Sequence, residues 1–99
     1  MLDFYIIDDN QALPAYPEKN ELEFAGGIDY QTFSNLQRKR VIDERLDYYS
    51  DFRIDTSLTK QIRQIITRLG LHADSDVKIL LQLFDAADKK RCGLVAYTD

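Results

Sequence analysis

One apolar segment near the C-terminal end limits how this chain of 99 residues can fold. We interpret this segment as a helix. Asp74 or Ser75 can cap its start, and Gly93 can end it in the left-handed conformation. The apolar side chains then fall on two stripes of the helix. One stripe holds Val77, Leu80, Leu81 and Phe84, and the other holds Ile79, Leu83 and Ala86. A helix that is apolar on two sides needs two packing partners. We therefore expect Val77–Ala87 to lie in the interior, between a sheet and another helix.

Two further helices are predicted earlier in the chain. The first covers about Tyr30–Lys39 and has Asp29 as its cap. The second covers about Ser57–Leu69, where a single apolar stripe ends at a glycine. Leu71–Asp74 then leads into the C-terminal helix, and so short a connection favours an antiparallel helical hairpin.

Three segments have the character of β-strands. They are Leu2–Ile7, Tyr48–Ile54 and Leu94–Tyr97. In Leu2–Ile7, apolar residues occupy both odd and even positions, which indicates a central strand or one covered on both faces. Leu22–Ala25 fits either a brief strand or a packed turn, and we expect Gly26–Gly27 to break it.

These elements predict an α+β fold and a single domain over residues 1–99, because chains divide into several domains only at roughly 250–300 residues. We expect a small, mostly antiparallel sheet made of the three predicted strands. The helical hairpin would cover one face of this sheet. The short helix after Gly27 would pack at an edge or on the other face.

The charge is negative overall and unevenly distributed. The formal net charge is -4. Residues 1–29 contain seven acids and one base, whereas the remaining 70 residues contain ten acids and twelve bases. A surface for nucleic acid would be basic and clustered. We therefore expect no nucleic-acid partner.

The sequence also bears on membranes and redox chemistry. No apolar run approaches the ~20 residues that span a bilayer, and no basic stretch followed by an apolar segment begins the chain. We expect a cytoplasmic protein with no membrane partner. Cys92 is the only cysteine, so neither an intrachain disulfide nor a zinc site of several thiolates is available.

No motif for catalysis stands out, and the sequence predicts neither an enzyme nor a cofactor. Cys92 follows three cations that could lower its pKa and make it reactive, although a single cysteine near a helix end is more often a packing residue. His72, Asp74 and Asp76 could supply metal ligands, but both acids also suit the N-terminus of a helix. GxSxG, P-loop and GxGxxG patterns are absent. We predict no metal site.

The segment Phe4–Asn10 resembles the first strand and acidic pair of phosphoacceptor receiver domains. This resemblance implies that Asp8 and Asp9 bind magnesium beside a phosphorylated aspartate, for which Asp55 lies at a suitable distance downstream. A strand followed by an ordinary acidic turn explains the same residues. A receiver-like or magnesium-dependent switch is therefore an alternative function.

The remaining signal is a surface. Acids in the first third of the chain, together with tyrosines such as Tyr16 and Tyr30, are typical of an electrostatically steered protein interface. The candidate partner-binding residues are Asp8, Asp9, Glu18, Glu21, Glu23, Tyr48, Tyr49 and Asp51. The other interpretation is that these acids only keep the protein soluble.

In size, acidity and single-domain build, and in the ending Cys92–Tyr97, the chain resembles the small bacterial immunity proteins that block a cognate toxin. This resemblance implies a non-enzymatic module that neutralises a basic protein partner through an acidic surface. A third hypothesis is a structural subunit of a homo-oligomer, in which Tyr49 or Phe52 completes a symmetric interface.

Overall fold

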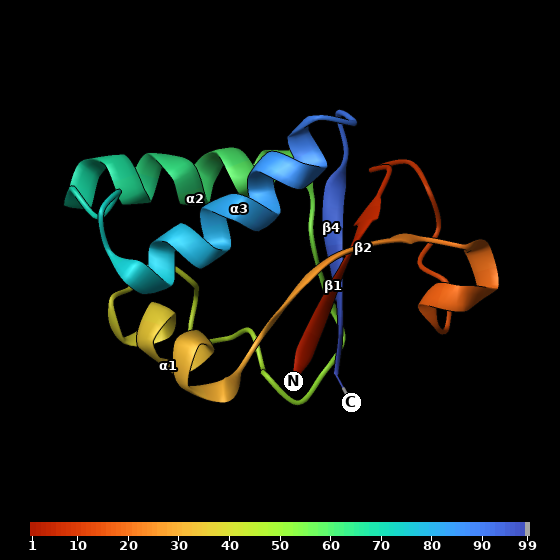
Figure 1. The fold of residues 1–99 in the computed structure, drawn as a ribbon, viewed down its shortest axis with the longest axis horizontal. Helices are drawn as coiled ribbons and strands as arrows, with labels where there is room; N and C mark the ends of the chain where they lie inside the picture. The colour runs from red at the N-terminus through yellow and green to blue at the C-terminus, as the bar shows by residue number, and fades with distance from the viewer. Residues whose placement is uncertain (99) are drawn as a thin grey trace.

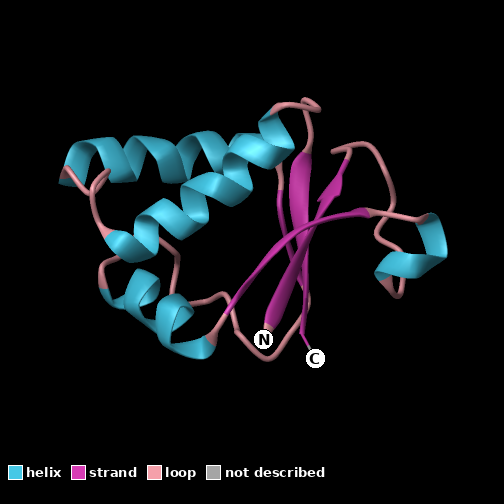
Figure 2. Ribbon diagram, viewed as in Figure 1, coloured by secondary structure: helices cyan, strands magenta, loops and turns pink. Residues whose placement is uncertain are grey.

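The computed structural model describes residues 1–98, apart from the side chains of Lys19 and Asn20. In chain order the elements are β1 (Leu2–Ile7), the 3-10 helix η1 (Pro17–Asn20), β2 (Glu23–Ile28), α1 (Tyr30–Arg38), β3 (Phe52–Ile54), α2 (Thr56–Leu69), α3 (Ser75–Asp88) and β4 (Gly93–Thr98). Within the described residues, four strands form one antiparallel sheet in the order β2-β1-β4-β3 (Figure 1, Figure 2). The predicted α+β class is confirmed.

The sheet has helices on one face and a loop on the other. Helices α1, α2 and α3 lie on the same face, and segment 8–22, which contains η1, lies on the opposite side (Figure 1). The prediction that α1 packs at an edge or on the other face was wrong. Asp29 alone separates β2 from α1, so α1 turns onto the helical face and buries Phe33 and Leu36 there. No helix among the described residues has the length and apolar character needed to cross a membrane.

Strand β1 is central, as its sequence predicted. Leu2, Phe4 and Ile6 are buried in the core beneath the helices. On the opposite face Ile7 is buried under segment 8–22, together with Val95 of β4. Because side chains alternate between the two faces of a strand, burial on both faces explains why β1 is apolar at both parities.

Helix α3 is buried along one wide arc and not on two opposite sides. Its buried residues are Val77, Leu80, Leu83, Phe84 and Ala87. Ile79 is 37% exposed, so the prediction that both stripes are interior was wrong for Ile79 and right for Leu83. Helix α3 contacts α1 and the strands β1, β2 and β4. The buried residues therefore form one arc, and Ile79 of the second stripe lies outside it.

Two predicted strand boundaries also need correction. The strand expected at Tyr48–Ile54 begins only at Phe52, because Asp47 forms a turn in which its carboxylate accepts a hydrogen bond from the Tyr49 backbone N–H. Gly26–Gly27 does not break a strand but lies inside β2. A Cβ at Gly26 would lie 2.8 Å from the Leu83 Cδ2 atom, so the glycine permits α3 to pack closely on β2.

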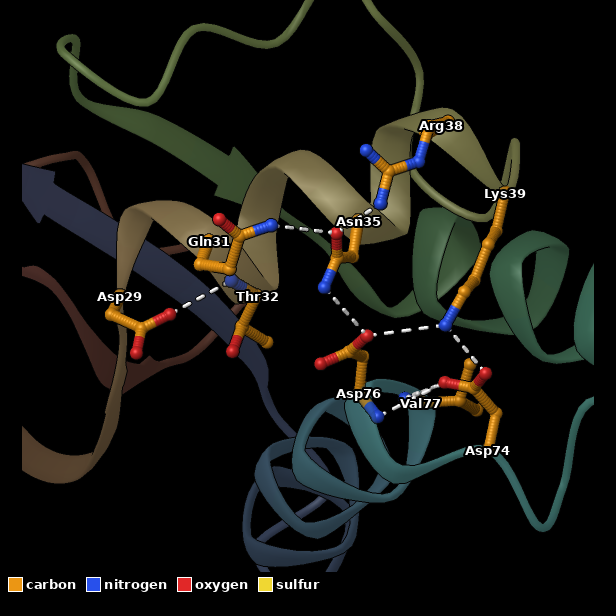
Figure 3. A network of polar contacts seen from close by, with 9 residues as sticks. All are labelled: Asp29, Gln31, Thr32, Asn35, Arg38, Lys39, Asp74, Asp76 and Val77. Atoms are coloured by element: carbon orange, nitrogen blue, oxygen red, sulfur yellow. Dashed lines mark hydrogen bonds and ion pairs between the residues drawn. The ribbon is translucent and has the colours of Figure 1, made fainter.

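A polar network joins α1 to the start of α3 (Figure 3). Lys39 Nζ lies 2.5 Å from Asp74 Oδ2 and 3.1 Å from Asp76 Oδ2. Asp74 Oδ1 accepts hydrogen bonds from the backbone N–H groups of Asp76 and Val77 at 3.0 and 3.1 Å, which confirms Asp74 as the helix cap. The hydrogen bond from Lys39, followed by that from Val77, lowers the pKa of Asp74.

This lowered pKa predicts a stability difference that depends on pH. Asn also serves as a helix cap, so Asp74→Asn removes the charge while keeping an acceptor. At pH 7 the variant is expected to unfold at a lower temperature, by the equivalent of about 0.2–1 kcal/mol for a partly exposed ion pair. A carboxylate whose pKa is lowered by folding stabilises above its unfolded pKa, and this contribution is lost as the pH falls through the folded value.

Thermal unfolding of both proteins between pH 7 and pH 2 measures the effect. The difference between them should shrink below the ordinary carboxyl pKa of 3.8 and disappear once Asp74 is protonated in the folded state. A difference that stays constant over this range would mean that Asp74 acts through its cap and not through its charge.

Candidate protein-binding surface

A hollow of about 250 Å³ lies where the sheet meets segment 8–22. It is lined by Asp3, Tyr5, Ala15, Tyr16, Pro17, Glu18, Asp51, Tyr97 and Thr98, which we call the acidic hollow. Three of these residues are carboxylic acids, and none of the described lining residues is Lys, Arg or His. The hollow therefore combines negative charge with tyrosine rings.

Strand pairing brings two of these carboxylates to either side of Tyr97. Asp3 of β1 is the cross-strand partner of Tyr97 in β4, and the register of β3 on β4 continues to Asp51 on the other side. Residues directly opposite each other on paired strands point to the same face of the sheet. Asp51 is held in this row because its Oδ1 accepts a hydrogen bond from the Thr98 backbone N–H at 3.0 Å.

The buried ring of Tyr97 forms the floor of the hollow. Tyr97 is 8% exposed, and its hydroxyl donates a hydrogen bond to the Pro14 carbonyl at 2.7 Å. Burial raises the pKa of Tyr97, and the charge of Asp51 raises it further. Tyr97 thus keeps its proton at neutral pH, and the negative charge of the hollow comes from the carboxylates.

Arg53 fastens segment 8–22 to the sheet. Its guanidinium donates hydrogen bonds to the backbone carbonyls of Gln11 at 2.7 Å and Asp8 at 2.8 Å. These bonds, together with the one from Tyr97 to Pro14, attach the segment at two points. The wall that carries Tyr16 and Glu18 is therefore anchored to the strands that carry the other acids.

A second surface feature is a group of three tyrosines. Tyr30, Tyr48 and Tyr49 form what we call the tyrosine patch. Tyr48 is 8% exposed, whereas Tyr30 is 55% and Tyr49 is 69% exposed. The ring of Tyr48 meets those of Tyr30 and Tyr49 nearly at right angles, with centroids 5.4 and 5.2 Å apart. Asp51 of the hollow follows Tyr49 by two residues in the sequence.

The eight candidate residues from the sequence do not form one surface. Glu18 and Asp51 lie in the acidic hollow, and Tyr48 and Tyr49 lie in the tyrosine patch. Glu23 forms an ion pair with Lys90 of the segment that precedes β4. Glu21, Asp8 and Asp9 are exposed, but the two aspartates follow the end of β1 opposite to Asp3.

The residues of the receiver resemblance act as turn and cap residues. Asp8 Oδ1 accepts a hydrogen bond from the Asn10 backbone N–H at 2.8 Å. Asp9 accepts from the backbone N–H and the hydroxyl of Thr56, and Asp55 caps α2. Repeated strand–helix units would give a parallel sheet, whereas every strand pair here is antiparallel. Among residues 1–98, no group of three or more His, Cys, Asp or Glu is placed to hold a metal.

Cys92 and Phe52, which the sequence analysis also considered, are both half-buried. Cys92 is half-buried, and burial raises its pKa, followed by the charges of Asp8 and Asp9. Lys90 lowers this pKa by less than burial and the two acids raise it, which favours the packing interpretation of Cys92 over a reactive thiol. Phe52, one of the two residues suggested for a symmetric interface, is half-buried and contacts other core rings.

Three of the acidic and aromatic residues that line the hollow were not predicted from the sequence. Asp3, Tyr5 and Tyr97 belong to strands whose apolar character suggested only core positions. One signal was available, since Asp3 is a charged residue in an otherwise apolar strand and points to the opposite face from Leu2 and Phe4.

The chain matches no protein-family model, and no curated protein or solved structure is significantly similar to it.

Proposed function

We propose that this protein is a non-enzymatic binding module that holds a basic protein partner through the acidic hollow and the tyrosine patch. The observation that carries the proposal is the row of Asp3, Tyr97 and Asp51, which shares its hollow with Glu18. Opposite charges across an interface accelerate encounter and select the partner, while tyrosines supply large contact areas. The partner is expected to present Lys or Arg side chains.

The charge of the lining supports this proposal. Asp3, Glu18 and Asp51 contribute carboxylates, and none of the described lining residues is Lys, Arg or His. A surface with this balance of charge attracts a cationic partner.

Neutralising the hollow tests the proposal. The hollow variant carries Asp3→Asn, Glu18→Gln and Asp51→Asn, which keep hydrogen-bond acceptors and nearly the same shape. With octa-lysine as the probe, titration calorimetry should show affinity weakened roughly 3- to 100-fold, since each exposed charge pair contributes about 0.2–1 kcal/mol. Binding of the unmodified protein should also weaken as salt rises.

A matched control carries Asp8→Asn, Glu21→Gln and Glu44→Gln, all of them exposed. Both variants change the formal net charge of -4 by the same three units. The control should keep most of the affinity. If both variants weaken binding equally, or if binding is insensitive to salt, the acidic hollow is not the binding site.

The resemblance to immunity proteins supports a finer proposal, in which the basic partner is a toxin that this protein neutralises. A toxin gene beside the gene for this chain supplies the test. Cells that express the toxin should survive when the unmodified protein or the control variant is present, and should die with the hollow variant. Survival with the hollow variant would argue against neutralisation at this site.

A further inference from the structure

We infer that the exposed ring pair of Tyr30 and Tyr49 binds the guanidinium group of an arginine on the basic partner. This inference rests on the proposed function, because it names the side chain by which that partner is recognised. The two rings are stacked, with centroids 6.1 Å apart and an angle of 29° between their planes. Both remain largely exposed, so a flat group can lie against them.

The backbone fixes both tyrosines in place before any partner binds. Tyr30 is the first residue of α1, directly after the cap Asp29, whose carboxylate accepts a hydrogen bond from the Thr32 backbone N–H at 2.8 Å. Tyr49 sits in a turn in which Asp47 Oδ1 accepts from its backbone N–H at 2.9 Å. Side chains that are already ordered lose less conformational entropy when a partner binds.

A row of core rings supports the pair from below. Tyr48, which contacts both exposed rings, also packs on Phe33 with centroids 5.6 Å apart. Phe33 in turn contacts Phe52 at 6.1 Å, and Phe52 contacts Phe4 of the central strand at 6.2 Å. The exposed tyrosines are therefore the outer end of a continuous aromatic row that starts in the core.

The charges around the pair favour a cation. Asp29 and Asp47 stand next to Tyr30 and Tyr48 in the sequence, and all three neighbouring aspartates, including Asp51, are exposed. The amino terminus offsets a small part of the charge of Asp29, whose pKa is lowered mainly by hydrogen bonds from Thr32. Arg45, the cation closest in sequence on this loop, is already bound by Asp43, with N–O distances of 2.8 and 3.1 Å.

The chemistry of the site favours arginine over lysine. A guanidinium is planar, stacks on aromatic faces and is more weakly hydrated than an ammonium group. It can also donate two parallel hydrogen bonds to one carboxylate. A stacked tyrosine pair with exposed aspartates close by in the sequence suits a guanidinium, whereas a lysine ammonium gains mainly the charge.

Two peptides of equal formal charge, octa-arginine and octa-lysine, measure this preference on the full chain. The unmodified protein is expected to bind octa-arginine roughly 2- to 5-fold more tightly than octa-lysine. Tyr49→Leu, which removes the ring at an exposed position, should bring the two affinities close to equality. Tyr49→Phe keeps the ring and should keep the preference.

Phe24→Leu provides a control for losing an exposed ring outside the patch, because Phe24 is 55% exposed and its ring contacts Tyr5 of the hollow, not the tyrosine patch. It should leave the preference unchanged. Equal affinity of the unmodified protein for both peptides, or an unchanged preference in Tyr49→Leu, would overturn the arginine site. Salt-dependent binding that the hollow variant loses would then still support the proposed function, so the two failures are distinguishable.

Discussion

Leu80→Ala is expected to lower the free energy of unfolding by about 2–5 kcal/mol, the range for removing a large buried aliphatic side chain. Leu80 is 0% exposed on the arc of α3 that faces the sheet. The loss combines the transfer energy of the removed carbon atoms with the cost of the cavity they leave. Because small domains have only about 5–15 kcal/mol of stability in total, the variant should unfold at a clearly lower urea concentration.

Ile79→Ala is the matched control, since it deletes the same number of carbon atoms from the adjacent position. Ile79 is 37% exposed, and alanine is the better helix former, so the loss should be about 1 kcal/mol or less. Urea unfolding followed by circular dichroism measures both variants. Equal losses would mean that α3 is buried on two sides after all.

Gly93→Ala should be the second most damaging of the substitutions considered. A Cβ at Gly93 would lie 2.7 Å from the Ile54 carbonyl oxygen and 2.9 Å from the Asp55 Cα. Both are backbone atoms, so β3 and β4 would have to move apart where α2 begins. Overpacking of this kind costs about 1–3 kcal/mol. If the loss of stability is near the upper end of that range, the Tm of Gly93→Ala should be roughly 10–20 °C below that of the unmodified protein.

Gly27→Ala gives the comparison within the same sheet. Its Cβ would meet the Met1 side chain at 3.0 Å, and that flexible chain can move aside. Neither Gly27 nor Gly93 has the positive φ that would strain an alanine. Thermal unfolding should therefore show Gly27→Ala close to the unmodified protein. A similar loss in both variants would refute the idea that backbone crowding at Gly93 sets the cost.

The helices and the central strand were predictable because each carries its own local signal. Leu2–Ile7 and the start of α3 at Asp74 follow from an unbroken apolar run and from capping chemistry. The second stripe of α3 was misjudged, because periodicity alone does not distinguish two buried sides from one wide arc. Gly93 was misjudged as a helix end, whereas the left-handed residue before β4 is Arg91, with φ of 56°.

The candidate surface was only partly predictable. Glu18, Tyr49 and Asp51 could be proposed from charge and aromatic content. Their neighbours Asp3 and Tyr97 could not, because only the register of three strands brings residues from both ends of the chain beside Asp51. The tyrosines posed a related problem, since Tyr48 and Tyr49 are adjacent in sequence but one is buried and the other exposed.

The aromatic row from Phe4 to Tyr49 ties recognition to folding. A mutation that repacks Phe33 or Phe52 would displace Tyr48 and thereby tilt the rings proposed to bind an arginine. Conversely, a ligand that clamps Tyr49 would restrict motion deep inside the protein. With the proposed arginine site, affinity and stability are coupled at this end of the molecule, and variants selected for one property should change the other.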